Sequence, residues 1–250
     1  MRLLKESVKI GVCGFPASRK DCFKSFHAVE IQQTFYDMPQ VTTLEKWRKN
    51  ANERFDFTIK AWQIITHESK SPTYKRMKAQ IPSSELWQVG SFKPTKWVIR
   101  GLEKTMEAAK ILSAKAIVFQ CPPSFLPTIE NIENICKFME KANELKSKLN
   151  LCPVFAWEPR GKWDDKTIAE ICGKFNLIHV VDVFERQSVT EKSFYFRLHG
   201  GYGYDHVYSD DELASLINWF DKYETGYCMF NNRQMYNDAR RLIALFSESD

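Results

Sequence analysis

Ionisable and amide side chains stand at the downstream ends of short apolar runs along most of the chain. These runs end in Glu30, Lys60, Gln120, Glu158, Asp182, Arg197, His199 and Asn231. Carboxylates and imidazoles in such a set can transfer protons, and lysine or arginine can hold an anion. Carboxylates together with a histidine can also bind a divalent metal. The chemistry therefore depends on which of these side chains the fold brings together.

The elements that must position these side chains are eight apolar runs separated by helical patterns. The runs cover residues 8–14, 28–36, 55–61, 116–125, 154–159, 179–183, 194–200 and 227–232, and the helical patterns cover 41–51, 95–112, 131–146, 209–223 and 237–246. Buried parallel strands joined by helices have this pattern. A barrel of eight such units needs about 250 residues, and its active site lies at the carboxyl ends of the strands. The sequence predicts an α/β fold, a single (β/α)8 TIM-type barrel domain over residues 1–250.

Alternation within each strand assigns the polar side chains to the barrel lumen, because successive residues point to opposite sides. Tyr195, Arg197 and His199 share one face of their strand, opposite bulky apolar residues. The inward set is Glu30, Lys60, Gln120, Glu158, Asp182, Arg197, His199 and Asn231. Burying so many charges is costly unless they pair or bind a ligand. The pairs that we expect are Lys60 with Glu30 or Glu158, Glu158 with Arg197, and Asp182 with His199. A desolvated Lys60 could instead form a Schiff base with a substrate.

Three of these residues resemble a metal-binding set. Glu158, Asp182 and His199 end the fifth, sixth and seventh strands, as in the divalent-metal sites of sugar-isomerase-like and apurinic-endonuclease-like barrels. Such ligands suit Mn²⁺, Mg²⁺ or Zn²⁺. The eighth strand offers only the neutral Asn231 and Asn232, however, and Arg197 shares a face with His199, which disfavours a bound cation. We expect no cofactor, and a divalent metal at Glu158, Asp182 and His199 remains the alternative.

The positive charge of the chain is concentrated in one segment. The chain has 36 basic and 31 acidic residues, and residues 60–104 hold nine basic and three acidic ones. This segment is a long basic loop after the third strand, followed by the start of a helix. Its interleaved aromatic residues are Trp62, Tyr74, Trp87, Phe92 and Trp97. Basic and aromatic side chains on one surface can bind nucleic acid, here through residues 70–100. The other interpretation is a lid packed by its aromatic side chains, and the sequence leaves both open.

Composition also limits the compartment. Hydrophobic residues make up 44% of the chain, but no apolar run approaches the roughly 18–20 residues of a membrane span, so we expect no membrane partner. The N-terminal residues lack the apolar core of a signal peptide. The seven cysteines are odd in number and widely spaced, which argues against a disulfide framework. We expect a cytoplasmic protein with reduced thiols, and the sequence does not predict its oligomeric state.

Several segments together resemble a known family. They read VEIQQTFYDMP, FTIKAWQIITH, SPTYKRMK, VFQCPPSF, FAWEPRGKW, YFRLHGGYGY and MFNN. Across roughly residues 8–246 the chain is similar to the YecE-like family of TIM barrels (domain of unknown function 72), and WQIITHESKSPTYKR resembles its archaeal branch. The resemblance implies a (β/α)8 barrel with its polar strand ends in one pocket, and it implies no particular reaction. His67 and Tyr202 lie in two of these segments and are added to the residues expected to contact a substrate.

Two classes of function follow from these observations. The preferred hypothesis is an enzyme that acts on an anionic or phosphate-bearing small molecule, with Glu30, Glu158 and His199 as proton-transfer groups. The expected substrate contacts are Lys60, His67, Gln120, Arg197, Tyr202 and Asn231. The alternative is a nucleic-acid-binding protein, or a metal-dependent nuclease or isomerase-like barrel. Hydrolase, lyase and isomerase reactions all remain open.

Overall fold

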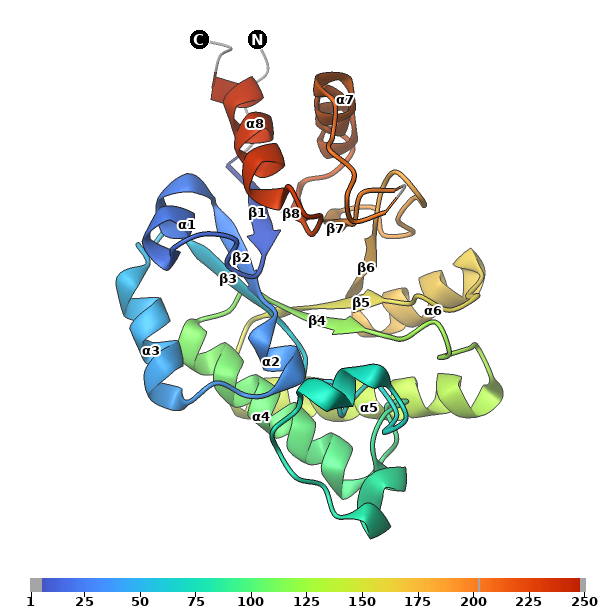
Figure 1. The fold of residues 1–250 in the computed structure, drawn as a ribbon. Helices are drawn as coiled ribbons and strands as arrows, with labels where there is room; N and C mark the ends of the chain where they lie inside the picture. The colour runs from blue at the N-terminus through green and yellow to red at the C-terminus, as the bar shows by residue number, and fades with distance from the viewer. Residues whose placement is uncertain (1–5, 202, 248–250) are drawn as a thin grey trace. The chain divides into compact units, whose positions relative to one another are not determined.

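The computed structural model describes residues 6–201 and 203–247 and has the predicted barrel fold (Figure 1). Its strands are β1 (Val8–Cys13), β2 (Ala28–Ile31), β3 (Asp56–Lys60), β4 (Ala116–Gln120), β5 (Val154–Glu158), β6 (Leu177–Val181), β7 (Ser193–Leu198) and β8 (Thr225–Phe230). They follow one another in sequence order around a closed barrel. The helices are α1 (Arg19–Ser25), α2 (Gln33–Tyr36), α3 (Val41–Asn50), α4 (Lys96–Leu112), α5 (Ile129–Lys148), α6 (Asp165–Phe175), α7 (Asp210–Phe220) and α8 (Met235–Ser247). The α/β barrel prediction is therefore confirmed.

The chain divides into two compact units. The first unit contains the described residues of 1–30, 50–57 and 178–250, and the second contains residues 31–49 and 58–177. The expectation that residues 1–250 form a single domain stays a prediction. None of the helices in the described part of the chain is long and apolar enough to cross a membrane.

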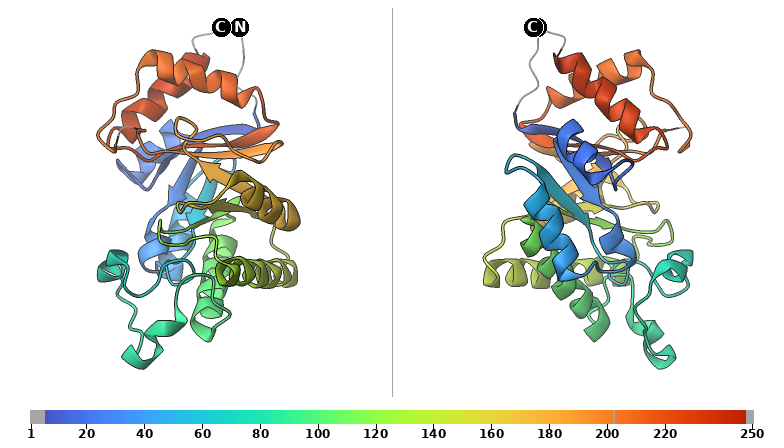
Figure 2. Two further views of the ribbon diagram at one scale, coloured as in Figure 1. Left: turned by 90° about the vertical axis from the view of Figure 1, so that its right-hand side faces the viewer. Right: turned by 60° about the vertical axis from the view of Figure 1, so that its left-hand side comes forward.

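In the first unit, β1 lies between β2 and β8, and β7 pairs with both β6 and β8. All these pairs are parallel, and the register places Cys13 beside Glu30 and Arg197 beside Met229. Figures 1 and 2 show α7 and α8 (orange and red) side by side against this part of the sheet. Phe194 and Phe196 stack on Phe220 of α7. The face opposite Arg197 is therefore the one covered by helices, as the alternation predicts.

In the second unit, β4 lies between β3 and β5, and the register places Gln120 beside Glu158. The outer faces of these strands pack under aromatic side chains, with Phe119 edge-on to both Phe138 of α5 and Phe155 of β5. Lys60, Gln120 and Glu158 are the last residues of their strands. The fold thus brings all three to the carboxyl ends of adjacent strands.

Two predicted strands are shorter than expected, and the run 116–125 is a strand only as far as Gln120. The apolar run 28–36 is a strand only as far as Ile31, after which Gln33–Tyr36 form the short helix α2. The Thr34 hydroxyl lies 2.9 Å from the carbonyl oxygen of Ile31 and 2.7 Å from that of Lys60. Such a side-chain bond to nearby backbone competes with strand pairing. The prediction of a strand to residue 36 was wrong, because the alternation of residue types does not reveal this turn.

The long basic loop between β3 and α4 has its own small core. Two short 3-10 helices, Pro72–Arg76 and Ser83–Gln88, lie within it. Trp62, Trp97 and Val89 are buried together, and Tyr74 packs against them. Phe92 is also fully buried, whereas Trp87 is 67% exposed. The aromatic residues of this segment therefore serve mainly to pack the loop.

Candidate functional site

The second unit holds a cluster of polar residues at the ends of β3, β4 and β5. Lys60, Gln120 and Glu158 are 6%, 8% and 6% exposed, respectively. Arg160, two residues beyond β5, donates from Nε to Oε1 of Glu158 at 2.7 Å. Together with His67, these residues form what we call the Lys60 cluster: Lys60, His67, Gln120, Glu158 and Arg160. Glu158 thus has a close cationic partner that lies next to it in sequence.

Two residues of α2, the helix that follows β2, contact Lys60. The Lys60 ammonium nitrogen lies 3.6 Å from the centre of the Phe35 ring, which belongs to α2. A cation above a ring face is attracted by the ring's electron density, and the attraction grows when water is excluded. The Thr34 hydroxyl approaches the Lys60 carbonyl oxygen from the same helix. The turn after β2 therefore positions both the ring and the lysine backbone.

The pKa of His67 depends in part on the charges of this cluster. Its ring meets the Phe35 ring edge-on at 4.9 Å, and its Nδ1 lies 2.8 Å from the Thr66 hydroxyl. Burial, and to a smaller extent the nearby Lys60 and Arg160, lower the pKa of His67 from 6.5 to about 3, while Glu158 acts in the opposite direction. His67 is therefore neutral near pH 7. The cluster carries two cations against one carboxylate, an excess of positive charge that favours an anionic ligand.

The first unit buries an ion pair between β2 and β7. Arg197 Nη2 lies 3.0 Å from Glu30 Oε1, and the two side chains are 1% and 0% exposed. The Tyr195 hydroxyl donates to Glu30 Oε2 at 2.8 Å. Tyr195 and Arg197 thus share the face that the alternation assigned to them. Both oxygens of Glu30 are engaged with this strand, which favours a structural role for Glu30 over proton transfer, although its assignment as a catalytic group stays a prediction.

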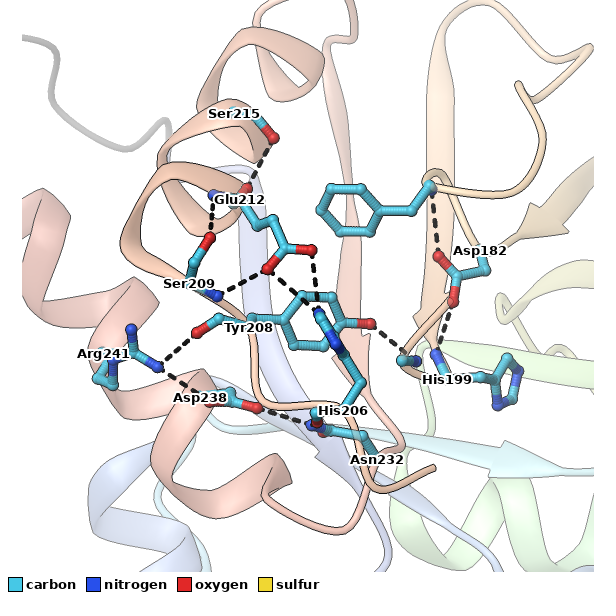
Figure 3. A network of polar contacts seen from close by, with 12 residues as sticks. Asp182, His199, His206, Tyr208, Ser209, Glu212, Ser215, Asn232, Asp238 and Arg241 are labelled. Carbon is cyan, nitrogen blue, oxygen red and sulfur yellow. Dashed lines mark hydrogen bonds and ion pairs between the residues drawn. The ribbon is translucent and has the colours of Figure 1, made fainter. Parts of the chain in front are cut away.

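His199 follows the last residue of β7 and contacts Asn231 and Asp182. Asn231 Nδ2 lies 3.0 Å from His199 Nδ1. Asp182 accepts the backbone N–H of His199 at 2.7 Å and that of Phe184 at 3.1 Å, as Figure 3 shows. Asp182 thus contacts the backbone N–H of His199. Asp182 joins the ends of β6 and β7.

The start of α7 is a poor anion site. TIM barrels frequently bind phosphate after the seventh and eighth strands, at a helix N-terminus. Here Ser209 and Glu212 form the predicted capping box, in which each side chain accepts a backbone N–H of the other residue. The first turn of α7 also carries Asp210 and Asp211. A small cavity of about 160 Å³ beside this turn is lined by Glu185, His206 and Glu212 among others. The acidic first turn would repel a phosphate, so the Lys60 cluster is the better candidate.

The predicted site residues fall into both units. Lys60, His67, Gln120 and Glu158 lie in the second unit, whereas Glu30, Asp182, Arg197, His199 and Asn231 lie in the first. Tyr202 lies outside the described residues. Three predictions concern residues of both units and stay predictions. They are the placement of these residues in one pocket, the pair of Glu158 with Arg197, and the metal set of Glu158, Asp182 and His199. Within residues 6–201 and 203–247, no three His, Cys, Asp or Glu side chains are grouped to hold a metal ion.

Three residues that sequence reasoning did not assign belong beside these sites. Arg160 contacts Glu158, Phe35 contacts Lys60, and the Tyr204 ring meets the His199 ring edge-on at 5.8 Å. Arg160 follows Pro159 outside the strand, so strand alternation could not place it. Tyr204 is 53% exposed, and an exposed aromatic ring beside a histidine was the available signal for it.

The loop after β7 requires glycine at residue 200. Gly200 has a φ of +100°, and a Cβ atom there would lie 2.2 Å from the carbonyl oxygen of Gly203. We expect Gly200→Ala to lower the free energy of unfolding by about 1–3 kcal/mol, the usual scale for a strained backbone position. Gly201→Ala is the matched control, because Gly201 has a φ of +53° and open space around its Cβ position. Urea unfolding measures both, and equal midpoints for the two variants would contradict this account of the loop.

Comparisons with known proteins agree with the fold. The family described as protein of unknown function DUF72 matches residues 20–249. A DUF72 family protein from Enterococcus faecalis V583 has a TM-score of 0.69 and 15% identity, over 97% of this chain and 96% of that chain. A DUF72 family protein from Thermotoga maritima MSB8 has a TM-score of 0.66 and 19% identity, over 96% and 99%. A xylose isomerase domain containing protein from Salmonella typhimurium LT2 has a TM-score of 0.61 and 12% identity, over 99% and 98%. A search of curated protein sequences finds no match.

Proposed function

This chain belongs to the DUF72 family of proteins of unknown function, and from its Lys60 cluster we propose that it is an enzyme acting on an anionic, phosphate-bearing small molecule. The observation that carries the proposal is the charge of this cluster, in which Lys60 and Arg160 lie with one carboxylate, that of Glu158. Two cations beside one carboxylate favour a further negative charge. Phosphate is the anion that lysine and arginine bind most commonly together.

The roles within the cluster follow from its charges. Lys60 and Arg160 bind the anion, with Lys60 as a point charge above Phe35 and Arg160 as a donor with several N–H groups. Glu158 is the general base, because it is the carboxylate beside them. His67, neutral near pH 7, supplies a ring nitrogen as a hydrogen-bonding partner for the substrate. Gln120, next to Glu158 in register, supplies an amide to orient the substrate. His199, beside Asn231 at the end of β7, is the proton-transfer candidate of the first unit.

The test is whether phosphate stabilises the protein through Lys60. We expect inorganic phosphate and phenyl phosphate to raise the melting temperature of the parent, since a ligand at a hundred times its Kd stabilises the folded state by about 2.7 kcal/mol. Lys60→Met should lose most of this gain, and so should Arg160→Met. Lys104→Met is the control, because Lys104 is half exposed and pairs only with Glu107 on the same helix.

Three outcomes would count against this proposal. An unchanged melting temperature of the parent in phosphate would contradict the anion site, and so would an equal stabilisation of Lys60→Met and the parent. Stabilisation by Mn²⁺ or Mg²⁺ without phosphate, abolished by His199→Ala, would favour the metal-dependent alternative. We propose that no metal is needed, because Asp182 already accepts two backbone N–H groups. The seven free cysteines support a cytoplasmic location.

A nucleic-acid-binding function is the second candidate, and exposed Trp87 is the observation in its favour. A base could stack on this ring, and Lys75 and Lys78 lie in the same loop. Other charges of the loop are engaged, however, because Lys93 pairs with Glu68 and Lys96 with Glu85. We therefore favour the enzyme. Binding of a single-stranded oligonucleotide that weakens steeply with salt and depends on Trp87 would reverse this preference.

A further inference from the structure

A cavity lined by cationic side chains lies beside α1 in the first unit. It has a volume of about 450 Å³ and lies between α1 and the segment that precedes β3. Its lining residues are Arg19, Lys20, Phe23, Lys24, Asn50 and Asn52. None of these belongs to the Lys60 cluster, and none stands at the carboxyl end of a strand. Its volume is within the range of about 300–1,000 Å³ that is usual for small-molecule sites.

The lining of this cavity is positively charged. Arg19, Lys20 and Lys24 contribute three cations, Asn50 and Asn52 contribute amides, and the lining contains no carboxylate. The acidic residue of α1 is Asp21, which accepts the Ser18 hydroxyl at 2.6 Å at the start of the helix. Its charge is therefore held at the end of α1, where an acidic side chain stabilises the helix dipole. The lining of the cavity accordingly offers several charged donors to an anion.

One wall of the cavity is apolar and rigid. Phe23 is only 7% exposed, and its ring packs edge-on against Phe55 at 5.0 Å and Phe57 at 5.9 Å. Phe15 meets the same ring at 6.0 Å. A side chain fixed in this way loses little conformational entropy when a ligand binds against it. The cavity thus combines a cationic rim with a preformed apolar surface.

We propose that this cavity binds an organic phosphate of mononucleotide size. The phosphate contacts Arg19, Lys20 and Lys24, and the flat apolar part of the ligand lies against Phe23. Asn50 and Asn52 donate to or accept from the polar groups of the ligand, as amides do. This site is additional to the proposed substrate site, so its occupant is a regulator or a second ligand. Its existence does not depend on the proposed function.

The experiment measures binding of AMP by calorimetry, with inorganic phosphate and adenosine as separate probes. We expect AMP to bind more tightly than phosphate, and adenosine to bind more weakly than AMP, since each lacks one half of the ligand. Arg19→Gln with Lys24→Gln should weaken AMP binding by at least about tenfold, because two charge-assisted contacts are lost. These side chains are exposed, so the fold should be retained.

The control variant is Lys137→Gln with Lys141→Gln on α5, which removes the same charge from exposed ion pairs. It should bind AMP as the parent does. Equal losses in the two double variants would overturn the proposal, and so would AMP binding that is lost only in Lys60→Met. An oligonucleotide that binds while AMP does not would also overturn it, and would assign the cations to a nucleic-acid backbone. Loss of AMP binding in Arg19→Gln with Lys24→Gln, together with unchanged phosphate stabilisation through Lys60, would support both sites separately.

Discussion

Arg197→Met is expected to destabilise the protein by about 3–5 kcal/mol, the scale for removing one partner of a buried ion pair. The reason is that Glu30, at 0% exposure, loses the guanidinium 3.0 Å away and stays buried in the fold. The Tyr195 hydroxyl still donates to Glu30, and a single neutral donor compensates only partly for a lost cation. Guanidinium chloride unfolding, followed by circular dichroism, measures the change in midpoint.

Two further variants separate this effect from a general loss of charge. Arg233→Met removes an arginine whose pair with Asp205 is 73% and 77% exposed, and it should change the stability by less than about 1 kcal/mol. Glu30→Leu combined with Arg197→Met replaces both charges by apolar groups and should recover much of the loss. If Arg197→Met unfolds at the same denaturant concentration as Arg233→Met, loss of the buried pair does not destabilise the protein by the expected amount.

Acid is expected to destabilise the protein through His67 between about pH 6 and pH 4. The folded-state pKa of His67 is about 3, well below the ordinary 6.5. Between these values the unfolded chain binds a proton that the folded chain does not, so the free energy of unfolding falls as the pH falls. One such histidine contributes about 1.4 kcal/mol per pH unit in the middle of this range, or nearly 3 kcal/mol over two units.

The His67→Gln variant isolates this contribution. Urea unfolding at a series of pH values should give a shallower pH dependence for the variant than for the parent, whatever its stability at pH 7. Burial and Lys9 also lower the pKa of His27, so part of the acid sensitivity should remain in the variant. Parallel curves for parent and variant would show that His67 is not held neutral.

The two-residue periodicity of the strands was sufficient to predict the barrel fold. Such a period determines which side chains share a face of a strand, whatever their partners are. It placed Tyr195 and Arg197 together, and both contact Glu30. Periodicity could not identify Glu30 as the partner of Tyr195 and Arg197. Glu30 is distant from them in sequence, and only the three-dimensional arrangement of the strands brings them together. Periodicity also could not place Arg160 or Phe35, because each lies beyond the end of a strand, where the local turn decides the direction of the side chain.

The basic loop shows a different limit. Its composition is compatible both with a nucleic-acid surface and with a packed lid, because lysines among aromatic residues occur in each. Burial distinguishes the two: Trp62 and Trp97 are buried with Val89, and only Trp87 among the five aromatic residues is classed as exposed. Charge counts are similarly ambiguous, because Lys93 and Lys96 are paired with acidic residues that lie elsewhere in the same segment.

The pairing of β1 with β8 has a consequence for how the protein is made. Thr225 contacts the carbonyl oxygen of Ser7 across 218 residues, at the start of this strand pair. A ribosome that adds about 5–20 residues per second needs roughly 10–45 s between the two. Throughout that interval one edge of β1 has no strand to pair with, and unpaired edges of this kind invite association between chains. Newly made chains should therefore need protection by a chaperone until translation passes β8.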